Sequence, residues 1–145
     1  MPPGLFEKSY EFELPTAGKL LAAGGHVHDY GVEVRLEDGE TGKVLFRLKS
    51  DKDAEGRVSS VEQKIFRRFF NLFDASIELR TNHRYRIVGV YDNPTGETIP
   101  AGGMAQIGAL FRPDYLADWP LNDPSDPVYQ LDLLGLPQLL MNHLH

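Results

Sequence analysis

The sequence predicts an all-β protein, an antiparallel β-sandwich or jelly roll that carries an irregular, partly helical C-terminal tail. Three observations lead to this prediction. Short stretches of alternating apolar and polar residues recur along the chain, and clusters of Gly, Pro, Asn and Asp separate them. No long amphipathic helix is expected before residue 112. A length of 145 residues suits one domain with a substantial core.

The first quarter of the chain contains two predicted strands. Alternation over residues 6–14 predicts the first, which Pro15 ends because proline cannot donate a hydrogen bond to a ladder. Residues 19–36 predict one long second strand. We expect this strand to be broken or bent at Gly24-Gly25, since glycine adopts backbone conformations closed to other residues.

The rest of the domain repeats the same signals. Alternation predicts further strands over residues 44–48, 76–79, 84–91 and 104–111. Asp38-Gly39 marks a hairpin turn and Asn93-Pro94 a second strong turn. Residues 58–73 fit either a short helix or an irregular strand, because four phenylalanines in it lie at helical spacing: Phe66, Phe69, Phe70 and Phe73.

The character of the sequence changes after Arg112, where prolines and aspartates become frequent. We therefore expect a β-sandwich domain over residues 1–112 and a proline-rich tail over residues 113–145. Two short helices are predicted in the tail, over 128–134 and 138–145. Such a tail is expected to pack on the domain or on a second copy of the chain, which would make a homo-oligomer.

Composition excludes several classes of protein. The formal net charge of −6 argues against nucleic acid as the main partner, because phosphate binding needs a basic face. The chain has no cysteine, so it has neither disulfides nor thiolate metal ligands. No run of about 18 apolar residues predicts a membrane span. Residues 1–4 lack the features of a signal peptide, so either the protein is cytosolic or the chain is a mature form with an added Met1.

His26 and His28 are candidate metal ligands. Two residues apart on a strand, they share a face, with Cβ atoms roughly 7 Å apart. Both imidazoles could then bind one ion at about 2.0 Å. If the strand continues to residue 36, the same face also carries Val34 and Leu36. A His-x-His pair is equally typical of polar surface residues, so a third ligand is needed to favour a metal site.

Met104 is the candidate third ligand. It opens a predicted strand behind Gly102-Gly103, much as His26 follows Gly24-Gly25, and polar Gln106 lies two positions on. A buried methionine normally fills gaps in a core, and this position is less typical of one. Two imidazoles and one thioether form a soft donor set, which favours Cu(I) and still holds Cu(II).

The order of these motifs resembles that of a known family. Three motifs carry the resemblance, namely Gly24-Gly25-His26-Val27-His28-Asp29-Tyr30-Gly31-Val32, then Tyr91-Asp92-Asn93-Pro94, then Gly103-Met104. Over roughly residues 18–112, the chain is similar to the C-terminal domain of copper type II, ascorbate-dependent monooxygenases, the peptidylglycine α-hydroxylating and dopamine β-hydroxylating group. It is also similar to their single-domain relatives, which carry a Gly-Gly-His-x-His-Asp-Gly-Gly signature.

The resemblance implies a mononuclear copper site on an antiparallel sandwich, with His26, His28 and Met104 as ligands. It further implies O₂ or peroxide activation or electron transfer, a small molecule or peptide as substrate, and an extracytoplasmic location, periplasmic or secreted. The chain has no room for the second, N-terminal copper domain of the full monooxygenases, and the disulfides of the animal enzymes are missing. The resemblance therefore implies the copper site more strongly than it implies hydroxylation.

Two alternatives remain open. His26-x-His28 with Glu33 and a later Pro100-x-Gly102 is similar to the motifs of cupins, which would bind Fe(II) or Mn(II) through two histidines and a carboxylate. Glu33 has the opposite strand parity to the histidines, so it reaches them only if the strand bulges near Gly31. The second alternative is a metal-free interaction domain whose surface is set by the tail.

Residues outside this set have expected roles of their own. Asp29 and Tyr30 are expected to support the ligands without binding the metal themselves. Asp29 would do so by accepting a hydrogen bond from an imidazole, if the backbone bends. His83 follows Asn82 in a turn and is predicted to be a surface residue. His143 and His145, beside Met141, form a second His-x-His pair, which is expected to be solvent-exposed at the chain end.

Overall fold

The computed structural model describes residues 1–67, 75–100, 102–121, 123–127, 129–131 and 134. Within these ranges the chain forms strands β1 (Gly4–Glu13), β2 (Gly18–Val27), β3 (Gly31–Asp38), β4 (Val44–Lys52), β5 (Val58–Val61), β6 (Gln63–Ile65), β7 (Ile77–Leu79), β8 (Arg84–Asn93) and β9 (Ala105–Pro113). A short 3₁₀ helix, η1 (Leu116–Asp118), follows β9.

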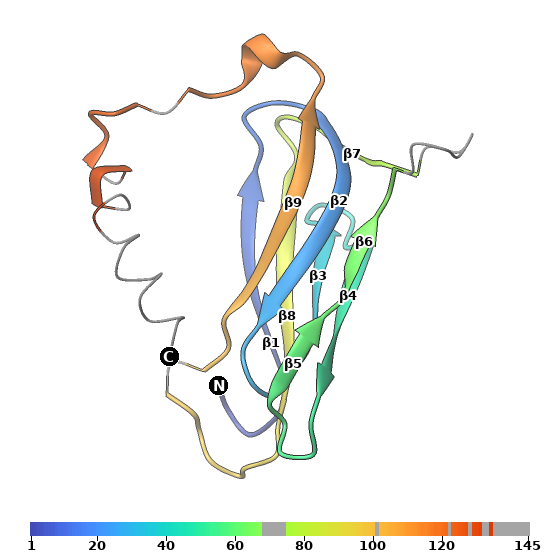
Figure 1. Cartoon of the computed structure of the whole chain (residues 1–145), viewed down its shortest axis with the longest axis vertical. Helices are drawn as coiled ribbons and strands as arrows, with labels where there is room; N and C mark the ends of the chain where they lie inside the picture. The colour runs from blue at the N-terminus through green and yellow to red at the C-terminus, as the bar shows by residue number, and fades with distance from the viewer. Residues whose placement is uncertain (68–74, 101, 122, 128, 132–133, 135–145) are drawn as a thin grey trace.

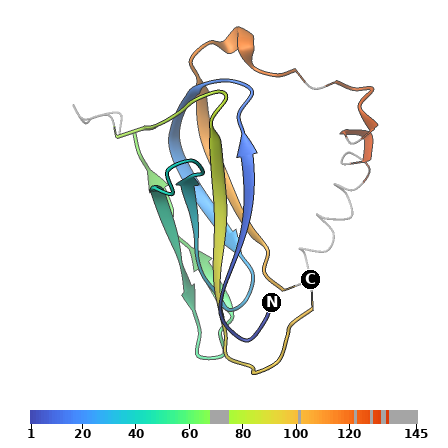
Figure 2. The ribbon, with the colours of Figure 1, turned by 180° about the vertical axis from the view of Figure 1, so that it is seen from behind.

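The strands form two antiparallel sheets that face each other (Figures 1 and 2). The large sheet has the order β1-β8-β3-β4-β5. In the small sheet, β9 pairs with one edge of β2, while β6 and β7 pair with different parts of its other edge. The prediction of an all-β antiparallel sandwich is confirmed, and the jelly-roll variant of that architecture stays a prediction.

The core lies between the two sheets. Its buried side chains come from both layers: Leu20, Ala23, Val27, Val34, Leu36, Phe46, Leu48, Leu79 and Tyr85. In β4 the buried Phe46 and Leu48 alternate with exposed residues, because successive side chains of a strand point to opposite faces of a sheet. On the other face of β4, Arg47 and Lys49 are exposed, while Glu33 and Glu37 on the other face of β3 are buried.

The prediction of one long strand over residues 19–36 is wrong. β2 ends at Val27 and β3 begins at Gly31, and the chain crosses between the sheets through the turn 28–30. In this turn Tyr30 has a φ of 64°, and the Gly31 N–H donates to the His28 carbonyl at 2.9 Å. The break therefore follows the two histidines instead of preceding them.

The expected role of Gly24-Gly25 is also wrong. Both glycines lie inside β2, and neither adopts a positive φ. The bulge of this strand is at Leu21, between the pairs that Leu20 and Ala22 make with β9. Gly25 is needed for space, because a Cβ there would lie 2.8 Å from side-chain carbons of both Val34 and Val61.

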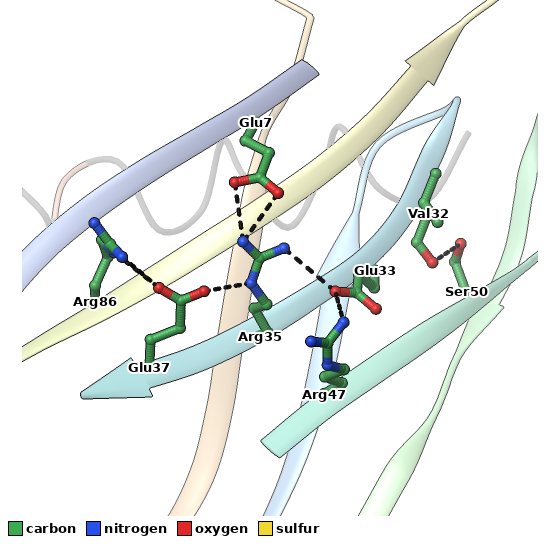
Figure 3. A network of polar contacts seen from close by, with 8 residues as sticks. All are labelled: Glu7, Val32, Glu33, Arg35, Glu37, Arg47, Ser50 and Arg86. Carbon is green, nitrogen blue, oxygen red and sulfur yellow. Dashed lines mark hydrogen bonds and ion pairs between the residues drawn. The ribbon is translucent and has the colours of Figure 1, made fainter. Parts of the chain in front are cut away.

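A network of ion pairs covers the outer face of the large sheet (Figure 3). Arg35 in β3 lies at its centre and contacts Glu7, Glu33 and Glu37. Arg86 pairs with Glu37 at 2.6 Å and Arg47 with Glu33 at 3.1 Å, so Glu33 and Glu37 have two cationic partners each. Burial opposes ionisation of Glu37, but the hydrogen bonds from Arg35 and Arg86 outweigh it and hold the pKa of this carboxyl below its usual value.

Side-chain hydrogen bonds hold both ends of β3 in place. Near its start, the Ser50 hydroxyl donates to the Gly31 and Val32 carbonyls, at 2.6 and 3.1 Å, beside a bulge at Val32 (Figure 3). At its end, Asp38 closes the predicted hairpin by accepting the backbone N–H groups of Glu40 and Thr41, both at 2.9 Å. The Thr41 N–H, with help from His83, holds the pKa of Asp38 well below its usual range.

The ambiguous region and the tail are described in part. Residues 58–65 form β5 and β6, which favours the strand interpretation, and the Phe66 ring packs on Phe46 at 5.2 Å between centroids. Phe69, Phe70 and Phe73 lie outside the described residues. In the tail, the Trp119 ring packs on Phe111 at 5.8 Å, so this part of the tail contacts the domain.

The two helices predicted in the tail are described only in part. The backbone is helical at residues 127, 129–131 and 134, where a helix over 128–134 was predicted, and the predicted helix over 138–145 lies outside the described residues. Within the described residues, no helix is long and apolar enough to cross a bilayer.

Candidate metal centre

The ends of β2 and β9 meet at one end of the sandwich (Figure 1). The ladder pairs His26 with Gln106 and Val27 with Ala105, and the His28 N–H then donates to the Met104 carbonyl at 3.1 Å. Opposite residues of an antiparallel pair share a face. Val27 is buried on the inner face, and His26 before it is exposed on the outer face of the small sheet. His28 and Met104 lie just beyond the ends of β2 and β9, and both are exposed.

The two imidazoles are close to each other and accessible. Their ring centroids lie 5.3 Å apart and their planes are nearly perpendicular, at 85°. With metal–nitrogen bonds of about 2.0 Å and roughly 1 Å from a ring nitrogen to the ring centre, two rings bound to one tetrahedral ion have centroids about 5 Å apart. Both side chains are exposed, and among the described residues none is hydrogen-bonded to either ring. The ring nitrogens are therefore available to a ligand.

The expectation that the histidines share a face with Val34 and Leu36 is wrong. Those two residues belong to the other sheet and are buried in the core, with exposed fractions of 0% and 3%. The crossover at residues 28–30 separates the histidines from that pattern. They face solvent because the strand that carries them ends before β3 begins.

Met104 lies beside the histidines without lining the same cavity. The histidines line a cavity of about 470 Å³. Met104 lines a neighbouring one of about 240 Å³, and Gly103 lines both. Gly103 has a φ of 85°, which explains why glycine precedes the methionine. The Met104 side chain is 46% exposed, and most of the residues that line its cavity come from β1 and β8 of the large sheet.

Asp29 and Tyr30 fix the turn that follows the histidines. The Asp29 carboxylate accepts the Val58 N–H at 3.1 Å, and the Tyr30 N–H donates to the Gly56 carbonyl at 2.7 Å. The Tyr30 ring lies over Gly56, where a Cβ would come within 2.5 Å of it. A hydrogen bond from an imidazole to Asp29 stays a prediction, and the Val58 N–H occupies Oδ1 of this carboxylate.

Asn93 organises the neighbouring loop, a role that sequence reasoning missed. It is 1% exposed, and its Nδ2 donates to the carbonyls of Pro2 at 3.1 Å and Glu97 at 2.8 Å. Its Oδ1 accepts from the backbone and the hydroxyl of Thr95. The Met1 ammonium donates to the Ile99 carbonyl at 2.8 Å, and both of these residues line the histidine cavity. The Asn93-Pro94 turn signal located this residue but not its partners.

Tyr91 is a second residue that sequence reasoning left without a role. It is 0% exposed and lies on the inner face of β8, where its ring contacts Phe6 at 6.4 Å between centroids. Its hydroxyl has no hydrogen-bond partner within the described part of the chain. Burial raises the pKa of this phenol to about 12.

The remaining candidates lie away from the histidines. Glu33 is held in ion pairs with Arg35 and Arg47 on the large sheet, so the geometry required by the cupin alternative is not formed. His83 lies in the predicted turn and is half-buried, with 14% of its side chain exposed. It bonds to Asp38 at 2.9 Å and its ring contacts that of Tyr85 at a tilt, at the opposite end of β3. His143, His145 and Met141 lie outside the described residues.

Across the described ranges, no three His, Cys, Asp or Glu side chains gather in a group that could hold a metal. A metal bound by His26 and His28 would therefore need a different kind of third ligand, and Met104 is the nearest donor of the predicted set. Comparisons of the chain with protein-family models, with curated proteins and with solved structures found no match.

Proposed function

We propose that this domain binds one copper ion through His26, His28 and Met104. The observation that supports the proposal best is the backbone bond between His28 and Met104, at 3.1 Å. It brings together three candidate ligands from two strands, although the methionine follows His28 by about 76 positions. All three side chains are exposed, and the spacing of the imidazole rings fits a shared ion.

The donor set favours copper over harder ions. Carboxylates would suit Fe(II), Mn(II) or Mg²⁺, while a thioether with two imidazoles suits Cu(I) and tolerates Cu(II). Bound copper would supply either electron transfer or activation of O₂ or peroxide, as in the monooxygenases that the sequence resembles. The histidine cavity of about 470 Å³, walled by Tyr30, Val58 and Ile99, offers room for a small molecule or a peptide side chain.

Copper stoichiometry tests the proposal directly. Untagged protein in which His143 and His145 are replaced by alanine should bind one Cu(I) tightly. Adding His26→Ala or His28→Ala should weaken binding by at least about tenfold, because a two-ligand remnant loses a bond and its geometry. His83→Ala is the matched control, since His83 is already bonded to Asp38, and it should bind like its parent. Equal binding by all of these variants would place the copper elsewhere.

X-ray absorption on the Cu(I) protein tests the sulfur ligand. A sulfur scatterer in the wild type should disappear in Met104→Ile, which keeps the apolar volume and the strand. A copper shell of nitrogen and oxygen alone would exclude Met104. Iron or manganese in the purified protein would instead support the cupin-like alternative, and protein without metal affinity would support an interaction domain.

A further inference from the structure

A third cavity lies between the sheets, at the end of the sandwich opposite the histidines. Its volume is about 340 Å³. The strands at the open edges of the two sheets wall it, with Phe12 from β1 and Ala109 and Phe111 from β9. Figures 1 and 2 show β9 passing from the histidine end to this end, where the tail begins. Ile107 is the lining residue of β9 nearest Met104, three residues on and roughly 10 Å along a strand, and the smaller cavity that Met104 lines shares Ile87 with this one.

The floor and the cover of this cavity come from different parts of the chain. Leu20, Leu36 and Leu79 line its inner side and are themselves buried in the core, at 3–5% exposed. Trp119 and Pro120, just after η1, line its outer side. Trp119 packs on Phe111 and is still 45% exposed, so it covers the cavity in part and leaves an entrance.

The lining is almost wholly apolar. Thr16 supplies the only hydroxyl among the residues that line it, and this hydroxyl makes a long hydrogen bond of 3.4 Å to the Ala17 carbonyl. No ionisable side chain of the described residues lines it. A charged ligand would lose its hydration without gaining a partner, which is strongly unfavourable. The chemistry therefore selects an uncharged, apolar molecule.

The volume sets the size of that molecule. Liquid water would need about eleven molecules to fill 340 Å³ at roughly 30 Å³ each, and one hydroxyl cannot satisfy them. An engineered apolar cavity of about 150 Å³ stays dry and binds benzene. A cavity about twice as large, inside the 300–1,000 Å³ range of small-molecule sites, fits about two aromatic rings or an alkyl chain of similar volume.

We propose that this inter-sheet cavity is a binding site for an uncharged apolar small molecule of that size. Its position between two layers and under Trp119 suits a small molecule better than the surface of a folded partner. The proposal does not depend on copper, since the cavity shares no lining residue with the histidine cavity.

Binding of 1-aminonaphthalene to the full chain tests the proposal, because this probe is uncharged at neutral pH and fluoresces more strongly away from water. The wild type should bind one equivalent saturably. Trp119 is the one tryptophan of the chain, so its emission should fall along the same curve. Naphthalene should displace the probe. Naphthalene-1-sulfonate, which has the same ring and a negative charge, should compete at least about tenfold less well.

Two variants of adjacent residues locate the site. Ala109→Phe puts a ring into the cavity, since Ala109 pairs with the buried Ala23 and faces between the sheets. It should weaken probe binding at least about tenfold. Leu110→Phe adds the same ring on the outer face, where Leu110 is 66% exposed, and should bind like the wild type. A naphthalene-induced rise in Tm, absent in Ala109→Phe, gives a second readout in proteins shown by circular dichroism to be folded.

Several results would overturn the proposal. These are the absence of saturable binding, equal competition by the sulfonate, and full binding by Ala109→Phe. Sedimentation of the wild type adds one more. If the chain dimerises and the probe binds only after dilution to monomer, a second copy of the chain is the occupant.

Discussion

The His28 N–H donates to the Met104 carbonyl, and this contact belongs to the main chain alone. The end of the β2–β9 ladder therefore does not require either side chain to hold it in place. Substitutions of the candidate ligands should change metal binding while the two strands keep their register. This makes the candidate site unusually suitable for dissection by mutation.

Replacing Met104 with His should keep copper but change which oxidation state is preferred. A thioether is a soft, neutral donor that stabilises Cu(I), whereas a third imidazole stabilises Cu(II) more. We expect the Cu(II)/Cu(I) reduction potential to fall by at least about 60 mV, which is a tenfold change in relative affinity for a one-electron couple. Potentiometric titration measures it. Gln106→His, one step along the same face, is the control, and an equal fall there would contradict a ligand role for Met104.

Replacing Gly25 with Ala should destabilise the domain by about 1–3 kcal/mol, because its Cβ would lie 2.8 Å from carbons of Val34 and Val61. Gly108→Ala is the matched control in the partner strand. A Cβ there meets nothing within 4 Å, and alanine should stabilise the strand by about 0.5–1 kcal/mol. Urea unfolding of the two variants measures both effects. Similar free energies of unfolding would mean that the sheets are not as close as the structure shows.

Replacing Tyr91 with Phe should leave stability unchanged or raise it by about 1 kcal/mol, since it removes a buried hydroxyl that has no partner. Tyr85→Phe is the opposite case. The Tyr85 hydroxyl accepts the Arg80 N–H at 2.7 Å, and its loss should cost about 1–2 kcal/mol. Thermal and urea unfolding distinguish the two. A large loss in Tyr91→Phe would show that the phenol has a partner.

The same tyrosine predicts a pH dependence. Burial raises the pKa of Tyr91 from 10.0 to about 12, so above pH 10 the unfolded chain loses this proton while the folded chain keeps it. Stability should therefore fall between about pH 10 and 12, by up to about 3 kcal/mol from this group. The stability of the wild type relative to Tyr91→Phe should therefore fall by that amount over this range. A constant difference between the two proteins would contradict the raised pKa.

Replacing Arg35 with Met should destabilise the domain by about 3 kcal/mol near neutral pH, because Glu33 and Glu37 would stay buried with one cationic partner each. The pKa of Glu37 lies below its usual 4.5 in the folded state, so its contribution is complete above that pH and is lost as the pH falls. The variant should therefore lose less stability than the wild type on acidification. Arg57→Met, which breaks an exposed pair with Asp53, should change stability by less than about 1 kcal/mol.

Much of the fold could be predicted because alternation is a local signal. The strands over 6–14, 84–91 and 104–111 appear as β1, β8 and β9 with their ends shifted by one or two residues. The connection at residues 28–30 could not be predicted in the same way, since the apolar pattern of β3 continues the parity of the histidines across the turn. A chain that changes sheets and a chain that continues straight give the same alternation here.

The candidate site was predicted in part from a local sequence motif and in part from the resemblance to copper monooxygenases. His26 and His28 are a local motif, but their pairing with Met104 is a long-range contact that spacing alone does not specify. The roles of Glu33 and His83 were missed for the same reason. Their partners Arg47 and Asp38 are 14 and 45 residues away, and a sequence does not show which distant charge a side chain will meet.

The extra residue at Leu21 has a consequence for transplanting the histidine pair into another protein. Before the bulge, Leu20 faces the core. After it, Ala23, Gly25 and Val27 do, which turns His26 and His28 toward solvent. The same residues in a regular strand without the bulge would instead bring His26 to the inner face, because side chains alternate along a strand. A transplanted His-x-His segment would thus need either this bulge or one residue fewer after Leu20 to keep both imidazoles toward solvent.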